Sequence, residues 1–73
     1  MTKEAFKQHV LSEAGKLRKK YPEYRKGQAV FNYINENYGN VARTCQFACH
    51  IDCFYIDENI DPFINTCYEL IYC

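Results

Sequence analysis

Apolar side chains recur at helical spacing in three stretches of the chain. In the first stretch, every third or fourth position is apolar: Phe6, Val10, Ala14, Leu17 and Tyr21. This spacing places the apolar side chains on one face and predicts a helix over residues 3–20, with Thr2 as its N-cap. Pro22 requires the helix to end at about Tyr21, because the residue before a proline is disfavoured in the helical conformation.

Two further stretches show the same spacing. A helix over residues 25–38 is predicted by Val30, Phe31, Ile34 and Tyr38. Gly39 follows it and can end it by adopting the left-handed backbone conformation. The third and clearest stretch carries six apolar residues: Ile60, Phe63, Ile64, Cys67, Tyr68 and Ile71. It predicts a helix over residues 60–72, in which Pro62 is tolerated because it lies in the first turn.

The expected fold is therefore all-α. A chain of 73 residues, 48% of them apolar and 16% aromatic, has room for one domain with one modest core and is too apolar for disorder. We expect a small three-helix domain over residues 1–73, with an irregular segment over about residues 40–57 between the second and third helices. Residues 41–46 within that segment could add a short helical turn or two.

Charge is unevenly distributed along the chain, although the net charge is zero. Residues 1–40 carry eight Lys or Arg against four Asp or Glu, a balance of +4, and residues 41–73 carry one against five, a balance of −4. Oppositely charged halves can pair between two copies as well as within one. Because a thin core also benefits from further burial, homodimerisation is one expectation.

The first twenty residues are interrupted by charges and lack the continuous apolar region of a secretory signal. No stretch approaches the roughly 18 apolar residues that span a membrane. We therefore expect a cytoplasmic protein without a membrane partner. In a reducing compartment thiols stay reduced, and the odd number of cysteines, five, excludes a fully paired set of internal disulfides.

Three of these cysteines and a histidine lie within nine residues: Cys45, Cys49, His50 and Cys53. Thiolate and imidazole are the ligands that zinc prefers, so these four residues are the candidate metal ligands. Structural zinc sites usually combine two separate pairs of ligands, whereas this chain has one tight cluster. Cysteine is also a common buried residue, and the spacing therefore favours core thiols over a metal or other cofactor.

Catalytic chemistry is a weaker interpretation of the same region. Cys49 or Cys53 could act as a nucleophile beside His50, and Asp52 and Asp57 could act as an acid and base pair. Adjacent residues rarely point at each other, however, and helix capping and turn formation explain the two carboxylates more simply. A domain of this size also has little room for a substrate cleft. We expect a protein that is not an enzyme.

A basic segment joins the first predicted helix to the second. Within residues 16–26 it contains six of the nine basic residues, including Lys16, Arg18, Lys19, Lys20 and Lys26. The segment could contact phosphates, with Tyr21 or Tyr24 stacked on a base. Cations are also favoured at the C-terminal end of a helix by its dipole, so a solvated helix end is the simpler interpretation. Nucleic-acid binding through this segment is the alternative function.

Two motifs resemble a pattern found in short uncharacterised proteins of tailed bacteriophages and prophages. In that pattern Arg-x-Gly-Gln-Ala-x-x-Asn precedes Asp-x-Phe-Tyr-x-Asp and a closing apolar helix. Here the first motif runs over residues 25–32 and the second over residues 52–57, so the resemblance covers about residues 25–64. The resemblance implies a phage or mobile-element origin and a bacterial host cytoplasm. It brings no activity and no catalytic residue with it.

The combined expectation is a non-enzymatic accessory protein that binds a host macromolecule. A host protein, such as a component of a defence system, is the favoured partner, because a small helical domain can block a surface without chemistry of its own. Arginine and tyrosine are enriched at interface hot spots. The candidate partner-binding residues are Tyr24, Arg25, Gln28, Asn32, Asp52, Tyr55 and Asp57.

Overall fold

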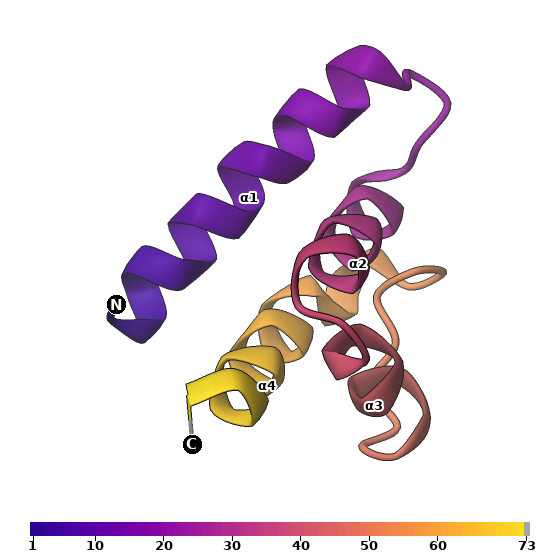
Figure 1. The fold of residues 1–73 in the computed structure, drawn as a ribbon. Coiled ribbons are helices and arrows are strands. Elements are labelled where there is room, and N and C mark those ends of the chain that lie inside the picture. Colours follow the sequence, from indigo (N-terminus) through magenta and orange to yellow (C-terminus); the bar gives the residue numbers. More distant parts are fainter. Residues whose placement is uncertain (73) are drawn as a thin grey trace.

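The computed structural model of the chain describes residues 1–72, which form four α-helices and one short 3₁₀ helix (Figure 1). In chain order they are α1 (Lys3–Lys20), α2 (Lys26–Asn37), α3 (Val41–Phe47), η1 (Asp57–Asn59) and α4 (Ile60–Tyr72). The all-α expectation is confirmed. The expected number of three helices is wrong, because the turn or two that residues 41–46 could add is a separate helix, α3, inside the segment that was expected to be irregular. At seven residues, α3 is too short for a repeated apolar pattern to stand out.

Local sequence explains where the helices begin and end. The hydroxyl of Thr2 accepts a hydrogen bond from the backbone N–H of Ala5 at 3.1 Å and so caps α1. Gly39 has a φ of 65°, which a glycine adopts without strain, and it turns the chain between α2 and α3. Pro62 lies in the first turn of α4, where the backbone N–H groups have no partner within the helix, so the absence of an N–H in proline costs no hydrogen bond.

Two central helices, α2 and α4, lie between α1 on one side and α3 on the other (Figure 1). The long helix α1 packs against both α2 and α4, and α3 packs against the same two helices. Between α3 and η1 the chain has no regular structure, and this segment, residues 48–56, returns towards the beginning of α2. The arrangement brings two distant parts of the sequence, about residues 25–28 and 52–59, together.

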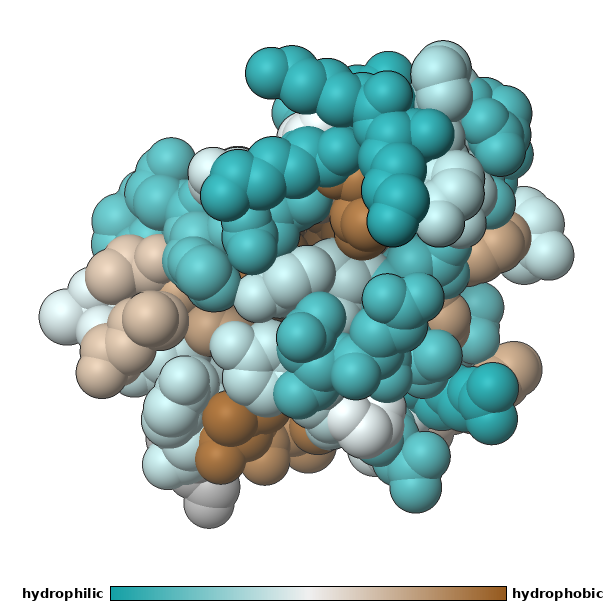
Figure 2. Space-filling model, turned by 45° about the horizontal axis from the view of Figure 1, so that its top comes forward, coloured by the Kyte–Doolittle hydropathy of each residue, from teal (hydrophilic) through white to brown (hydrophobic). Residues whose placement is uncertain are grey.

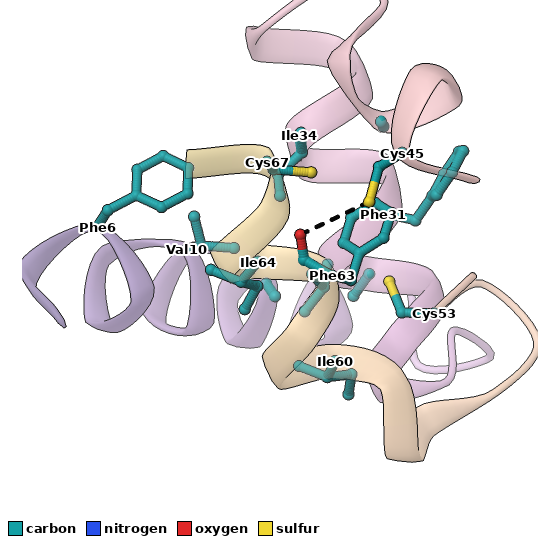
Figure 3. Packing of buried hydrophobic residues seen from close by; sticks show 14 residues of the cluster. Phe6, Val10, Phe31, Ile34, Cys45, Cys53, Ile60, Phe63, Ile64 and Cys67 are labelled. Atoms are coloured by element: carbon teal, nitrogen blue, oxygen red, sulfur yellow. Dashed lines mark hydrogen bonds between the residues drawn. The ribbon is translucent and has the colours of Figure 1, made fainter. Parts of the chain in front are cut away.

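The core is built from one apolar face of each helix (Figure 3). Phe6 and Val10 of α1 are fully buried, and so are Ile34 of α2 and both Phe63 and Ile64 of α4. Phe6 and Val10 are four residues apart, and Phe63 and Ile64 follow the buried Ile60 by three and four residues, as the apolar faces expected from the sequence require. Burying an aliphatic or aromatic side chain of this size contributes about 1.5–3 kcal/mol each, which makes this cluster the main source of stability.

Hydrophilic side chains cover most of the face shown in Figure 2, and apolar side chains emerge only in separate patches. Within residues 1–72, no helix is both long enough and apolar enough to cross a membrane. The most exposed large apolar side chains of these residues are Met1, Tyr21, Phe47, Tyr55, Ile56, Leu70 and Tyr72.

Candidate functional site

The beginning of α2 is held by residues that follow it by about thirty positions. Gly27 donates its backbone N–H to Oδ1 of Asp57 at 3.1 Å. The first N–H groups of a helix have no partner within the helix, and a carboxylate placed there also interacts favourably with the helix dipole. Asp57 therefore caps α2 from a distant part of the chain. The Cys53 thiol adds a bond of 3.4 Å to the carbonyl oxygen of Gly27.

Arg25 connects the same helix end to the aromatic pair Phe54 and Tyr55. Its Nη2 donates to the carbonyl oxygen of Phe54 at 2.6 Å. The guanidinium carbon lies 6.0 Å from the centre of the Phe54 ring and 5.7 Å from that of Tyr55, within range of a cation–π interaction. Gln28 supports this arrangement by accepting the backbone N–H of Arg25 on its Oε1 at 3.4 Å.

The Asp52 side chain forms hydrogen bonds within the returning segment, residues 48–56, and to α3. Its Oδ1 accepts the backbone N–H of Phe54 at 3.0 Å and the side-chain amide of Gln46 at 2.8 Å, and its Oδ2 accepts the N–H of Tyr55 at 3.2 Å. The backbone carbonyl of Asp52 accepts a further bond of 2.9 Å from Asn59. One carboxylate thus ties α3 to the segment and fixes the direction in which Phe54 and Tyr55 leave it.

Five of the seven expected partner-binding residues meet at this junction: Arg25, Gln28, Asp52, Tyr55 and Asp57. Their contacts are mostly internal, so the two motifs that carry the phage resemblance have a structural role in joining α2 to residues 52–59. Arg25 and Asp57 are exposed but are engaged in these contacts, Gln28 and Asp52 are half-buried, and Tyr55 is an aromatic residue that is 72% exposed. This makes Tyr55 the member of the set that is best placed to touch a partner.

The other two expected residues lie outside this hydrogen-bond network. Asn32 is half-buried one helical turn beyond Gln28 on α2. Tyr24 lies in the turn between α1 and α2, where its ring stacks on that of Tyr21 with the centres 5.0 Å apart. The structure therefore does not place Asn32 and Tyr24 with the junction residues.

An apolar groove of about 490 Å³ lies beside the junction. Phe31 and Phe54 contribute to its lining, and their rings are nearly perpendicular, at 89°, with the centres 5.4 Å apart. Phe47 and Tyr55 also line the groove, and they are 70% and 72% exposed. Phe47 was not among the residues predicted from the sequence. Its sequence position could have indicated this role, because Phe47 does not lie on the helical face that Val41 and Cys45 share.

The basic segment is exposed along most of its length but is partly engaged with its own surroundings. Lys16 forms an ion pair of 2.8 Å with Glu13, and this bond lowers the pKa of the Glu13 carboxyl. Arg18 donates to the carbonyl oxygen of Tyr24 at 3.3 Å. Of the remaining expected phosphate contacts, Lys19, Lys20 and Lys26 are exposed, with the Lys20 ammonium 5.5 Å from the centre of the Tyr21 ring.

The four cysteines of residues 1–72 divide into three that are buried and one that is exposed. Cys45, Cys53 and Cys67 are fully buried, and the thiol of Cys45 points at the carbonyl oxygen of Phe63 across 3.9 Å (Figure 3). Burial raises the pKa of Cys45 to about 11 and that of Cys53 to about 12, and it also raises the pKa of Cys67. The interpretation as core thiols is confirmed for Cys45 and Cys53 but is wrong for Cys49, which is exposed.

The structure separates the four candidate metal ligands. Cys49 and His50 lie at the surface after α3, and His50 has a φ of 58°, whereas Cys45 and Cys53 point into the core. Over residues 1–72, no group of three or more His, Cys, Asp or Glu side chains is arranged to hold a metal ion. The raised pKa values of Cys45 and Cys53 also disfavour the thiolate that a nucleophile or zinc ligand requires.

Comparison with protein-family models, with curated proteins and with solved structures finds no match for this chain.

Proposed function

We propose that this chain is a non-enzymatic accessory protein of a phage or mobile element and that it acts by binding a host protein. The observation that carries the proposal is the pair of exposed aromatic side chains, Phe47 and Tyr55, on the lining of the groove. Exposed aromatic groups that flank an apolar groove are typical of surfaces that bind other proteins. The phage resemblance supports a host protein, such as a defence component, as the partner.

A binding role also agrees with how the carboxylates of the junction are used. Asp52 accepts three hydrogen bonds and Asp57 caps α2, so both groups stabilise the fold in the positions they occupy. Their contacts hold Phe54 and Tyr55 in place before any partner arrives. A surface that is already ordered loses less conformational entropy on binding, which favours affinity.

The test is capture of a partner on the immobilised chain from a lysate of the bacterium whose phage or prophage carries the gene. The lysate is treated with nuclease, and retained proteins are quantified by mass spectrometry. We expect one host protein to be retained by the wild type and lost from Phe47→Ala and Tyr55→Ala. Leu70→Ala is the matched control, because Leu70 is an exposed apolar residue of α4 outside the groove. Equal retention by all four proteins would contradict the proposal.

A second candidate is nucleic-acid binding through residues 16–26. The stacked rings of Tyr21 and Tyr24 beside the exposed Lys19, Lys20 and Lys26 favour it, since aromatic rings and cations together bind single strands. It predicts an affinity that falls steeply with salt and that Lys19→Glu or Lys20→Glu weakens for any sequence alike. Fluorescence anisotropy with labelled oligonucleotides at two salt concentrations measures both effects.

A further inference from the structure

The groove beside Tyr55 has a shape and a charge that together specify a class of partner. Aromatic groups dominate its lining, with Phe31 and Phe54 packed edge to face and Phe47 and Tyr55 standing exposed. The groove is open to solvent, and its volume of about 490 Å³ is large enough to receive a bulky side chain. A bulky aliphatic or aromatic side chain is therefore the natural occupant.

The two sides of the groove are tied together in the free protein. Phe47 belongs to α3 and Tyr55 to the segment that follows it, and the bond of 2.8 Å from Gln46 to Asp52 joins the two elements. Arg25 of the loop before α2 also fixes the segment that carries Tyr55, because its side chain donates a 2.6 Å hydrogen bond to the carbonyl oxygen of Phe54. The groove is thus preformed, which lowers the entropic cost of filling it.

The charge on the groove lining is positive. Arg43 is exposed and is the one charged residue among the six that line it. Arg25 lies close by, with its guanidinium 5.7 Å from the centre of the Tyr55 ring. The carboxylate of Asp52, which is bonded to the groove residue Gln46, also accepts two backbone N–H groups of its own segment. An arginine fork binds a carboxylate through two parallel hydrogen bonds, so this charge is complementary to an acidic group.

We propose that the groove binds a peptide segment of the partner protein in which a bulky apolar side chain lies next to a carboxylate. The apolar side chain enters between Phe47 and Tyr55, and an Asp, a Glu or a C-terminal carboxylate pairs with Arg43. This inference rests on the proposed function and adds the chemistry of the partner to it.

A single-stranded nucleic acid is the competing occupant, because bases also stack on exposed aromatic rings. Nucleic-acid affinity comes mainly from several phosphate contacts along a strand. Here Arg43 is the one charged residue among the six that line the groove. The Arg25 side chain is already bonded to the carbonyl oxygen of Phe54. The arrangement therefore suits one carboxylate better than a row of phosphates.

The experiment selects binders from a library of random twelve-residue peptides displayed with free C-termini, using the full chain and its variants as bait. Phe47→Ala and Tyr55→Ala remove the aromatic contacts, and Arg43→Glu reverses the charge at the groove. Lys19→Glu makes the same charge change on an exposed residue of α1, and circular dichroism checks that every variant is folded. Selected peptides are then synthesised, and their dissociation constants are measured by anisotropy.

On wild type and Lys19→Glu, we expect the selected peptides to share a bulky apolar residue beside Asp, Glu or the C-terminus. Phe47→Ala and Tyr55→Ala should weaken their binding at least tenfold, since aromatic residues dominate interface energetics. On Arg43→Glu, the acidic preference should disappear and Lys or Arg should replace it. This reversal is a result that a merely structural role of Arg43 does not produce.

Three results would overturn the inference. They are no enrichment of any peptide, an enriched motif without an acidic group, and unchanged binding by the Phe47 or Tyr55 variants. If the peptide motif fails while the host protein is still lost from Phe47→Ala and Tyr55→Ala, the chemistry of the partner is wrong but the proposed function stands. If a random single-stranded oligonucleotide binds instead and Tyr55→Ala abolishes its binding, the groove is a nucleic-acid site.

Discussion

Replacing Gly27 with alanine tests how closely residues 52–57 pack on the beginning of α2. A methyl group at this position would overlap the carbonyl oxygen of Cys53, and it would lie 2.8 Å from Oδ1 of Asp57 and 3.1 Å from the carbonyl carbon of Cys53. Ordinary contacts of such a methyl group begin at 3.4 Å. The obstacle is backbone rather than the end of a flexible side chain, so the whole segment has to move away.

That movement separates the hydrogen bonds that join the segment to α2. The bond from the Gly27 N–H to the Asp57 carboxylate contributes about 1.5–3 kcal/mol, as is usual for bonds to charged groups. The weaker bond of the Cys53 thiol to the Gly27 carbonyl contributes about 0.5 kcal/mol. Alanine regains about 1 kcal/mol through its higher helix propensity. The expected net loss in the free energy of unfolding is therefore about 2 kcal/mol, or about 10 °C in Tm for a domain of this size.

Thermal and guanidinium unfolding followed by circular dichroism measure both quantities. Gly15→Ala is the matched control, because Gly15 lies within α1 and a methyl group there has no neighbour within 4 Å. It should stabilise the protein by about 0.5–1 kcal/mol through helix propensity alone. If Gly27→Ala is as stable as Gly15→Ala, the segment does not pack on α2 as described, and the structural account of the two motifs fails.

Three further predictions concern the returning segment and the thiols. Asp52→Ala should lower the free energy of unfolding by about 2 kcal/mol, because it leaves backbone N–H groups of the segment without an acceptor. Asp52→Asn keeps one oxygen and should therefore lower it less. Chemical unfolding of both variants compares the two losses. Among the cysteines of residues 1–72, Cys49 should react at once with a thiol reagent and Cys45, Cys53 and Cys67 only on unfolding, as mass mapping of the labelled peptides can show. Stability should also fall as the pH rises from about 9 towards 12, since the unfolded chain loses its thiol protons near 9.0 while the folded pKa values of Cys45 and Cys53 are about 11 and 12. A slope in the free energy of unfolding that is as steep in Cys45→Ala as in the wild type would argue against this assignment.

Helical periodicity was sufficient to predict most of the helical structure. The apolar faces of α1, α2 and α4 repeat over three or more turns, so both their existence and their approximate ends follow from the sequence. Helix α3 has only two turns and buries only Ala42 and Cys45, which is too few positions to define a period. Its existence depends on packing against α2 and α4, and this information is not local to residues 41–47.

The candidate site could be predicted only in part. The two motifs supplied candidate residues, but their sequence did not show whether these residues meet; in the structure Arg25 and Asp57 both contact the other segment. Their polar side chains suggested a recognition patch, but the bonds they form are internal. The groove was not predicted, since it needs Phe47 of α3 and Tyr55 of the next segment to lie on the same side of the molecule. That placement depends on the path of residues 48–56, for which the sequence shows no period.

The central claim is that a host protein binds at the groove, and a map of backbone amide chemical shifts tests it most directly. The captured partner, or the peptide selected for the groove, is added to the isotopically labelled full chain, and the shifted amide signals are assigned. We predict that they cluster on α3 around Arg43 and Phe47 and on the segment around Phe54 and Tyr55. Shifts that instead cluster on residues 16–26, with the groove residues unchanged, would contradict the claim.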